Sequence, residues 1–168
     1  PCPKGKRFWH FYDWAEGLTG AEVHPEEGGL SGKRFDAPLN MFLILALRAT
    51  ATLAGACKDS SLEERYHKIS GEMALAVDAK FWDEKAGAYQ TFAGEQAIKN
   101  HFAELTQGLA LLSGVAGDKH EGLRKMLASE KNRLVETTLS QSLYKFQALL
   151  MGDSNYARWV VDKIKADW

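Results

Sequence analysis

The sequence lacks an excess of charge of either sign. Its 168 residues hold 21 Lys and Arg against 22 Asp and Glu, a formal net charge of -1. Binding to a phosphate backbone normally needs a clear basic excess, so no nucleic-acid partner is expected. The longest apolar run, Met41 to Leu47, is too short to cross a bilayer, and no basic segment followed by an apolar one marks a signal peptide. We therefore expect no membrane partner either, while the compartment stays unknown.

Cysteine is also scarce, with only Cys2 and Cys57, which is too few for a disulfide framework. The five histidines show no His-Glu-x-x-His spacing and no Cys-x-x-Cys pair is present, so the usual zinc signatures are missing. The stretch GGLSGKR at 28–34 has a Gly-Lys pair, but Glu27 and Arg34 stand where a phosphate-binding loop needs Gly and Ser or Thr. We expect no metal and no cofactor.

Residues 1–35 show no sustained period of 2 or 3.6, and their prolines and glycines are typical of loops. Helical periodicity begins at Asp36, where an acidic cap and Pro38 in the first turn predict a helix start. The segment from about 39 to 57 is apolar almost all round, which predicts a helix buried on most sides. The stretch SSLE at 60–63 then fits a capping box for the next helix.

Apolar and amphipathic helices alternate along the rest of the chain. Segments of about 101–116 and 137–151 are again strongly apolar, and each is followed by a stretch with a single apolar stripe. Buried inner helices paired with amphipathic outer ones predict a helical toroid or solenoid, whereas an up-and-down bundle would give every helix a similar stripe. The expected fold class is therefore all-α, with about three helical hairpins over 36–168. Glycines predict a short β-like excursion near 82–92.

The irregular first segment contains an aromatic stretch, RFWHFYDWAEGLTG at residues 7–20. Rings beside carboxylates suit a sugar, because the rings cover its apolar C–H faces and the carboxylates accept its hydroxyls. Convergence of such groups in a cleft is typical of ligand sites. The candidates for carbohydrate contact are Trp9, Asp13, Trp14 and Glu16. The alternative is a hydrophobic plug under the helices, which composition alone favours, because large aromatics dominate core burial.

Two polar clusters lie near the starts of apolar helices. His101, Glu104 and Gln107 fall at steps of three, hence roughly on one helix face, where they either line a cavity or bond internally. We add His101 and Glu104 to the candidates for carbohydrate contact. The second cluster, at 136–141, begins with Glu136 and opens the last apolar helix, where an N-terminal cap is the simpler interpretation.

Three motifs occur in a fixed order along the chain. The stretch FWHFYDWAEGLTG is followed by FDAPLNMFLILALRAT, then FWDEKAGAYQTF leads to HFAELTQGLALLSGVAGD, and LSQSLYKFQALLMGDSNYARWVVDKIKADW comes last. In this order they resemble bacterial six-hairpin glycosidases of the α-L-rhamnosidase-like group. The resemblance implies a single partial (α/α)6-toroid domain over 1–168. It also implies a protein that hydrolyses glycosidic bonds, usually with inversion.

Inverting enzymes need two carboxyl groups about 6.5–9.5 Å apart. In the family that this chain resembles, the general acid lies upstream of the aromatic stretch and the general base follows the last hairpin. Neither residue is therefore carried onto this chain, and its catalytic residues stay unknown. The resemblance matches Trp9, Asp13 and Trp14 to pocket-lining positions, with Glu104 as a further one. The suspects, should the chain alone be active, are Asp13, Glu16, Glu104 and Glu136.

An incomplete toroid predicts an exposed apolar flank, covered by the remainder of the same toroid or by a second copy of the chain. A free-standing helical repeat module that binds a protein or a glycan without catalysis is the main alternative, and it predicts polar faces on both terminal hairpins. A toroidal polysaccharide lyase is a weaker alternative, with Tyr12 and His10 as its acid and base. In every case carbohydrate is the expected or a possible partner.

Overall fold

The structure, a computed structural model, describes residues 11–20, 34–95, 97–151 and 156–167. Helices dominate it, and the strands are short. In chain order its elements are β1 (Arg34–Asp36), α1 (Ala37–Ala56), α2 (Ser60–Phe81), β2 (Trp82–Asp83), β3 (Ala88–Tyr89), β4 (Phe92–Gly94), α3 (Glu104–Leu112), the 3-10 turn η2 (Gly117–Lys119), α4 (His120–Leu127), α5 (Ser142–Leu150) and α6 (Ala157–Asp167).

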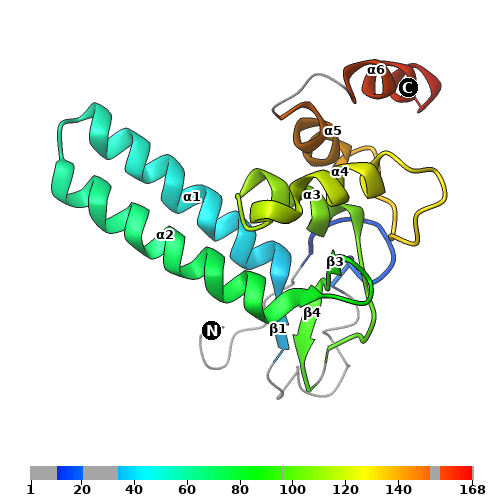
Figure 1. The fold of residues 1–168 in the computed structure, drawn as a ribbon, viewed down its shortest axis with the longest axis horizontal. Coiled ribbons are helices and arrows are strands. Elements are labelled where there is room, and N and C mark those ends of the chain that lie inside the picture. The colour runs from blue at the N-terminus through cyan, green and yellow to red at the C-terminus, as the bar shows by residue number, and fades with distance from the viewer. Residues whose placement is uncertain (1–10, 21–33, 96, 152–155, 168) are drawn as a thin grey trace.

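The helices form successive pairs, with α1 and α2 as a long antiparallel hairpin followed by α3 with α4 and α5 with α6 (Figure 1). The first helix of each pair lies on the inside, because α3 packs against both α1 and α5. This arrangement confirms the predicted all-α fold of helical hairpins.

Helix starts follow the predicted residues only in part. Asp36 is the N-cap of α1, but its side chain makes no capping bond, and proline stands in the first turn as expected. The capping box predicted at 60–63 is wrong: the N-cap of α2 is Asp59, whose Oδ1 accepts the Leu62 backbone N–H at 3.0 Å. An aspartate one residue earlier offers a charged acceptor to the same orphan donors, and it therefore displaces the serine.

The expected burial of α1 on most sides is wrong. One face, with Met41 and Ile44, is fully buried, but Leu39, Leu43 and Leu53 are about half exposed or more, at 53%, 47% and 66%. Among the described residues no element covers that flank, which confirms the predicted exposed apolar edge. By length and composition α1 could also cross a membrane, a test that core helices of soluble proteins pass as well.

The predicted β-like excursion is present as two antiparallel ladders. β2 pairs with β3, with Trp82 opposite Tyr89, across a turn in which Gly87 has a φ of 62°. β4 pairs with β1, which joins the excursion to the start of α1 and was not predicted. Gly94 ends β4 with a φ of 117°, a region that favours glycine.

Buried polar bonds tie the ladders to the hairpins. Gln107 in α3 is fully buried, and its amide accepts the Tyr89 N–H and donates to the Tyr89 carbonyl, both at 2.8 Å. Asp78 in α2 accepts the Tyr89 hydroxyl and the Lys119 ammonium, the latter at 2.9 Å. Burial, with the adjacent carboxylate of Asp78, raises the pKa of Tyr89. The first two hairpins are thereby fixed to each other through one strand.

Candidate functional site

The described part of the aromatic stretch, residues 11–20, is a loop that lies across the N-terminal ends of all three inner helices. The Tyr12 hydroxyl donates to Asp36 Oδ2 at 2.9 Å, directly before α1. His101 Nε2 bonds the Glu16 carbonyl at 2.9 Å, just ahead of α3. The third tie joins Asp13 to the segment before α5. This one loop is therefore hydrogen-bonded to all three hairpins, directly before the inner helix of each.

Asp13 is fully buried, and its carboxylate is taken up by backbone and hydroxyl donors. It accepts the Trp14 N–H at 2.8 Å and the Thr138 N–H at 2.9 Å, and the Thr138 hydroxyl donates to it as well. Buried polar groups need such hydrogen-bond partners, and these donors supply them for both carboxylate oxygens. Asp13 therefore closes the loop onto the segment before α5, and its oxygens do not face the exterior.

Glu104 also accepts hydrogen bonds from the segment before α5, through Thr137. It is 2% exposed; Oε2 accepts the Thr137 N–H at 3.1 Å and hydroxyl at 3.3 Å, and Oε1 forms a buried ion pair with Lys145. Thr137 and Thr138, which we call the threonine strap, thus lie between two buried carboxylates. The predicted N-terminal cap at 136–141 is wrong, because α5 begins only at Ser142 and its N-cap makes no side-chain bond.

The prediction that His101, Glu104 and Gln107 share a helix face is also wrong. His101 lies in an extended segment before α3, 8% exposed, and bonds the aromatic loop, while Glu104 bonds the strap and Gln107 a strand. A carbonyl can only accept, so His101 Nε2 is the donor in this bond, and the buried Nδ1 has no partner among the described residues. The ring also abuts Gly17, whose φ is 71° and whose Cβ, if present, would lie 2.4 Å from Nε2.

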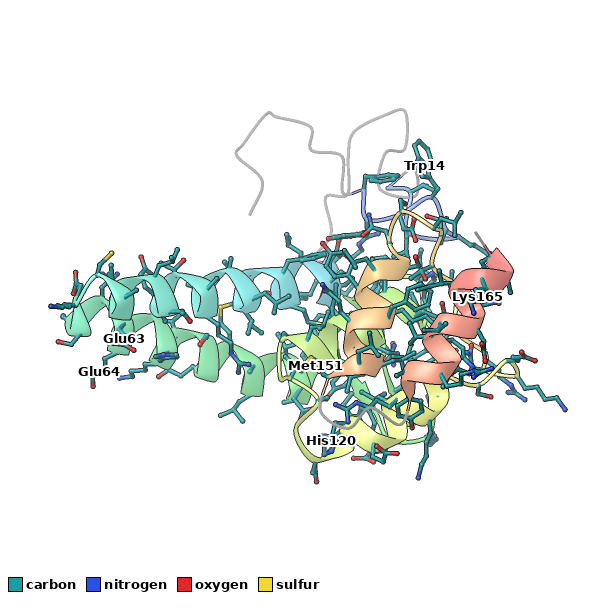
Figure 2. All side chains as sticks on the ribbon, turned by 90° about the horizontal axis from the view of Figure 1, so that it is seen from above. Trp14, Glu63, Glu64, His120, Met151 and Lys165 are labelled. Atoms are coloured by element: carbon teal, nitrogen blue, oxygen red, sulfur yellow. The ribbon has the colours of Figure 1, made fainter. Side chains whose placement is uncertain are left out.

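Two aromatic rings of the loop are exposed. Trp14 is 69% exposed and projects away from the helices (Figure 2), and Phe11 is 38% exposed. Their ring centroids lie 4.9 Å apart, in an edge-to-face arrangement. The hydrophobic plug is therefore made by Leu18 and its small neighbours rather than by these rings. We call Phe11 and Trp14 the aromatic platform.

Of the remaining predicted contact residues, Glu16 is exposed two residues after Trp14 in the loop, and Trp9 lies outside the described residues. Glu136 is exposed at the other end of the threonine strap. Across the described ranges, no three His, Cys, Asp or Glu side chains gather as a metal site would need. The structure thus separates an exposed group, with the platform and Glu16, from a buried group that holds it in place.

Sequence reasoning missed Lys145, and it interpreted the residues of the threonine strap as a helix cap rather than as partners of two carboxylates. A signal for the first was present: Lys145 is a lone cation inside an apolar helix, and Glu104 is a lone anion inside another. Opposite charges placed in apolar helices are expected to pair, because an isolated buried charge is very unfavourable. The strap gave no such signal, since its partner Asp13 lies 125 residues away in the chain.

Comparisons with known proteins give a family and a fold. A profile described as Trehalase matches residues 31–150. The chain is similar to a solved GH78 family rhamnosidase of Bacillus sp. GL1, with 24% identity and a TM-score of 0.76. That match covers 94% of this chain and 16% of the rhamnosidase chain, so this chain spans a small part of that protein's length. No curated protein gives a significant match.

Proposed function

This chain belongs to the trehalase family and folds as part of a six-hairpin toroid of the glycosidase type, and from that premise we propose that it is part of a glycoside hydrolase. Its role in that enzyme is to bind carbohydrate. The complete acid and base pair is supplied by residues other than those of this chain. By analogy with the GH78 rhamnosidase, the sugar is an α-L-rhamnoside.

The observation that carries this proposal is the exposed aromatic platform. Phe11 and Trp14 are held at the N-terminal ends of the inner helices, with the exposed Glu16 two residues further along the loop. Exposure of a large ring needs a reason, because burying it would gain about 25 cal/mol for each Å² removed from water. A pyranose ring gives that reason: its C–H face covers the indole, and its hydroxyls donate to the carboxylate.

The state of the carboxylates supports the second half of the proposal. Asp13 and Glu104 are buried and bonded to the threonine strap, and Glu104 is neutralised by Lys145 as well. A general acid must release a proton to the substrate and a general base must reach a water, so both need access that these two side chains lack. Glu16 and Glu136 are exposed, but Glu16 lies on the aromatic loop and Glu136 directly precedes the threonine strap.

The rival functions gain no support from the described residues. An open repeat module should have polar end faces, whereas Leu39, Leu43 and Leu53 are exposed on α1, and Val161 and Ile164 on α6. The lyase alternative needs an ionisable tyrosine. The Tyr12 hydroxyl instead donates to Asp36, and burial together with that carboxylate raises its pKa. His10 lies outside the described residues.

Two assays of the 168-residue chain test the proposal. Incubation with aryl α-L-rhamnosides, other aryl glycosides and trehalose should give no turnover above buffer. Titration with methyl α-L-rhamnoside should quench tryptophan fluorescence in a saturable way, and Trp14→Ala should abolish that quenching at the platform. Robust turnover would place the catalytic pair inside this chain and overturn the proposal. A quench that Trp14→Ala leaves unchanged would remove the platform from it.

A further inference from the structure

A hollow lies on the other side of the threonine strap from Asp13. It has a volume of about 290 Å³ and opens between the N-terminal ends of α3 and α5, the flank of α6 and the segment 129–139. Glu104 and Lys145 form its buried wall, Trp159 and Lys163 come from α6, and Asn132 and Glu136 come from the segment. None of these residues belongs to the aromatic platform.

Lys145 in the wall has hydrogen-bonding capacity left over. An ammonium has three N–H donors, and among the described residues its one hydrogen-bond acceptor is Glu104. The Nζ also lies 5.3 Å from the centroid of the Trp159 ring, a cation–π contact that satisfies no N–H in the usual geometry. The side chain is 9% exposed, so water has little access to these donors. An acceptor oxygen inside the hollow would take one of the two remaining N–H donors.

The charge of the lining selects the kind of ligand. Two lysines face four carboxylates, those of Glu104, Glu130, Glu136 and Asp167. Lys163 is itself paired with Asp167 at 3.1 Å, and this bond, with the nearby glutamates, raises its pKa and keeps it charged. An anion would meet this net negative lining unfavourably. A neutral ligand with many hydroxyls can donate to the exposed carboxylates and accept from Lys145.

We propose that this hollow binds one neutral pyranose ring, with a ring hydroxyl accepting from Lys145 Nζ, others donating to Glu136, and the C–H face against Trp159. The volume is at the low end of ligand pockets, which suits a single ring rather than a longer glycan. This is a second carbohydrate site, and it does not depend on the platform being a sugar site. A free monosaccharide and the terminal unit of a glycan share this chemistry.

Saturation-transfer NMR and calorimetric titration with D-glucose, L-rhamnose, trehalose and inorganic phosphate test the site. The chain is used as Trp14→Ala, which removes the platform, and we expect saturable binding of a monosaccharide but not of phosphate. Replacing the buried pair by Glu104→Gln with Lys145→Met keeps the wall uncharged and should weaken binding about tenfold or more, since a bond to a charged donor is lost. Lys165→Met is the matched control and should change nothing, because this exposed lysine of α6 does not line the hollow (Figure 2).

A second variant, Glu136→Gln, changes an exposed rim residue without touching the buried pair. It should weaken binding several-fold with little effect on stability, because substitutions at exposed positions change the free energy of unfolding only slightly. Tighter binding of trehalose than of glucose would assign the site to a terminal glycan unit rather than a free sugar. The inference is overturned if Trp14→Ala abolishes all binding, if phosphate binds better than the sugars, or if the neutral pair binds as well as Lys165→Met does. The first of those outcomes leaves the proposed platform intact, because the platform is tested separately by its quenching assay.

Discussion

The buried pair of Glu104 and Lys145 allows a sharp prediction about stability. The two residues are 2% and 7% exposed and come from neighbouring inner helices, α3 and α5. Lys145→Met removes one charge and leaves Glu104 buried, with its bonds to Thr137 but without its counter-ion. Breaking a buried pair in this way costs about 3–5 kcal/mol. That is a large fraction of the total free energy of unfolding of a domain, which is about 5–15 kcal/mol.

The prediction becomes a measurable shift in urea unfolding. With a slope of about 2 kcal/mol/M, a loss of about 4 kcal/mol lowers the urea midpoint by about 2 M. The double change Glu104→Gln with Lys145→Met should recover most of that loss. A buried pair that is replaced by neutral groups of similar volume is close to neutral in stability, and the glutamine oxygen can still accept from Thr137. The coupling between the two sites in a double-mutant cycle should therefore exceed 1 kcal/mol or so.

Arg158→Met serves as the control, because it breaks an exposed ion pair with Asp162 at 2.8 Å on α6. Such a pair is screened by solvent, so the change should not move the midpoint measurably. If Lys145→Met moves the midpoint no further than Arg158→Met does, then the pair is not buried in solution. In that case the arrangement of α3, the threonine strap and α5 described above is incorrect.

Three further predictions concern the aromatic loop. Asp13→Asn replaces an acceptor oxygen by an amide donor that faces the N–H donor of the strap, and it should lower the free energy of unfolding by about 1–3 kcal/mol. Its control, Glu16→Gln at an exposed position, should leave the urea midpoint unchanged. Gly17→Ala places a Cβ 2.4 Å from a nitrogen of His101 at a φ of 71°, and it should lower the free energy of unfolding by about 2 kcal/mol or more. Its control, Gly122→Ala in α4, where the Cβ meets open space, should stabilise the fold slightly. The pKa of Tyr12 is raised in the folded state, so folding holds this proton more tightly; the stability gained is complete below the unfolded value of about 10 and falls as pH rises above it. Urea midpoints at pH 9 and 11 should show a smaller fall for Tyr12→Phe than for the original chain, and an equal fall would contradict the assignment.

The succession of hairpins was predictable because it depends on local periodicity. Each inner helix is apolar on several sides and each outer helix has one stripe, and both patterns survive in the structure as packed pairs. The extent of burial of α1 was not predictable. Apolar residues such as Leu53 show only that a surface prefers to be covered, not whether a covering element is present.

The candidate site was predictable in its residue types but not in their roles. Trp14 and Asp13 are neighbours in the sequence, yet one ring is exposed and the adjacent carboxylate is fully buried. What separates them is the strap residue Thr138, which reaches Asp13 from a distant part of the chain. The spacing of nearby residues does not reveal such a distant partner. Glu136 and its neighbours were therefore predicted to cap a helix, which is the usual local role of such polar residues.

The threonine strap also decides how the two proposed sugar sites relate. Thr138 holds the loop that carries the platform, through Asp13, and Thr137 holds the wall of the hollow, through Glu104. Adjacent residues of one extended segment cannot move independently by much, because they share a peptide plane. A shift of α5 relative to α3 would therefore displace both sites together. Conversely, a sugar that tightens the wall at Glu104 and Lys145 restricts the strap, and through it the position of Trp14, so binding at one site should strengthen binding at the other.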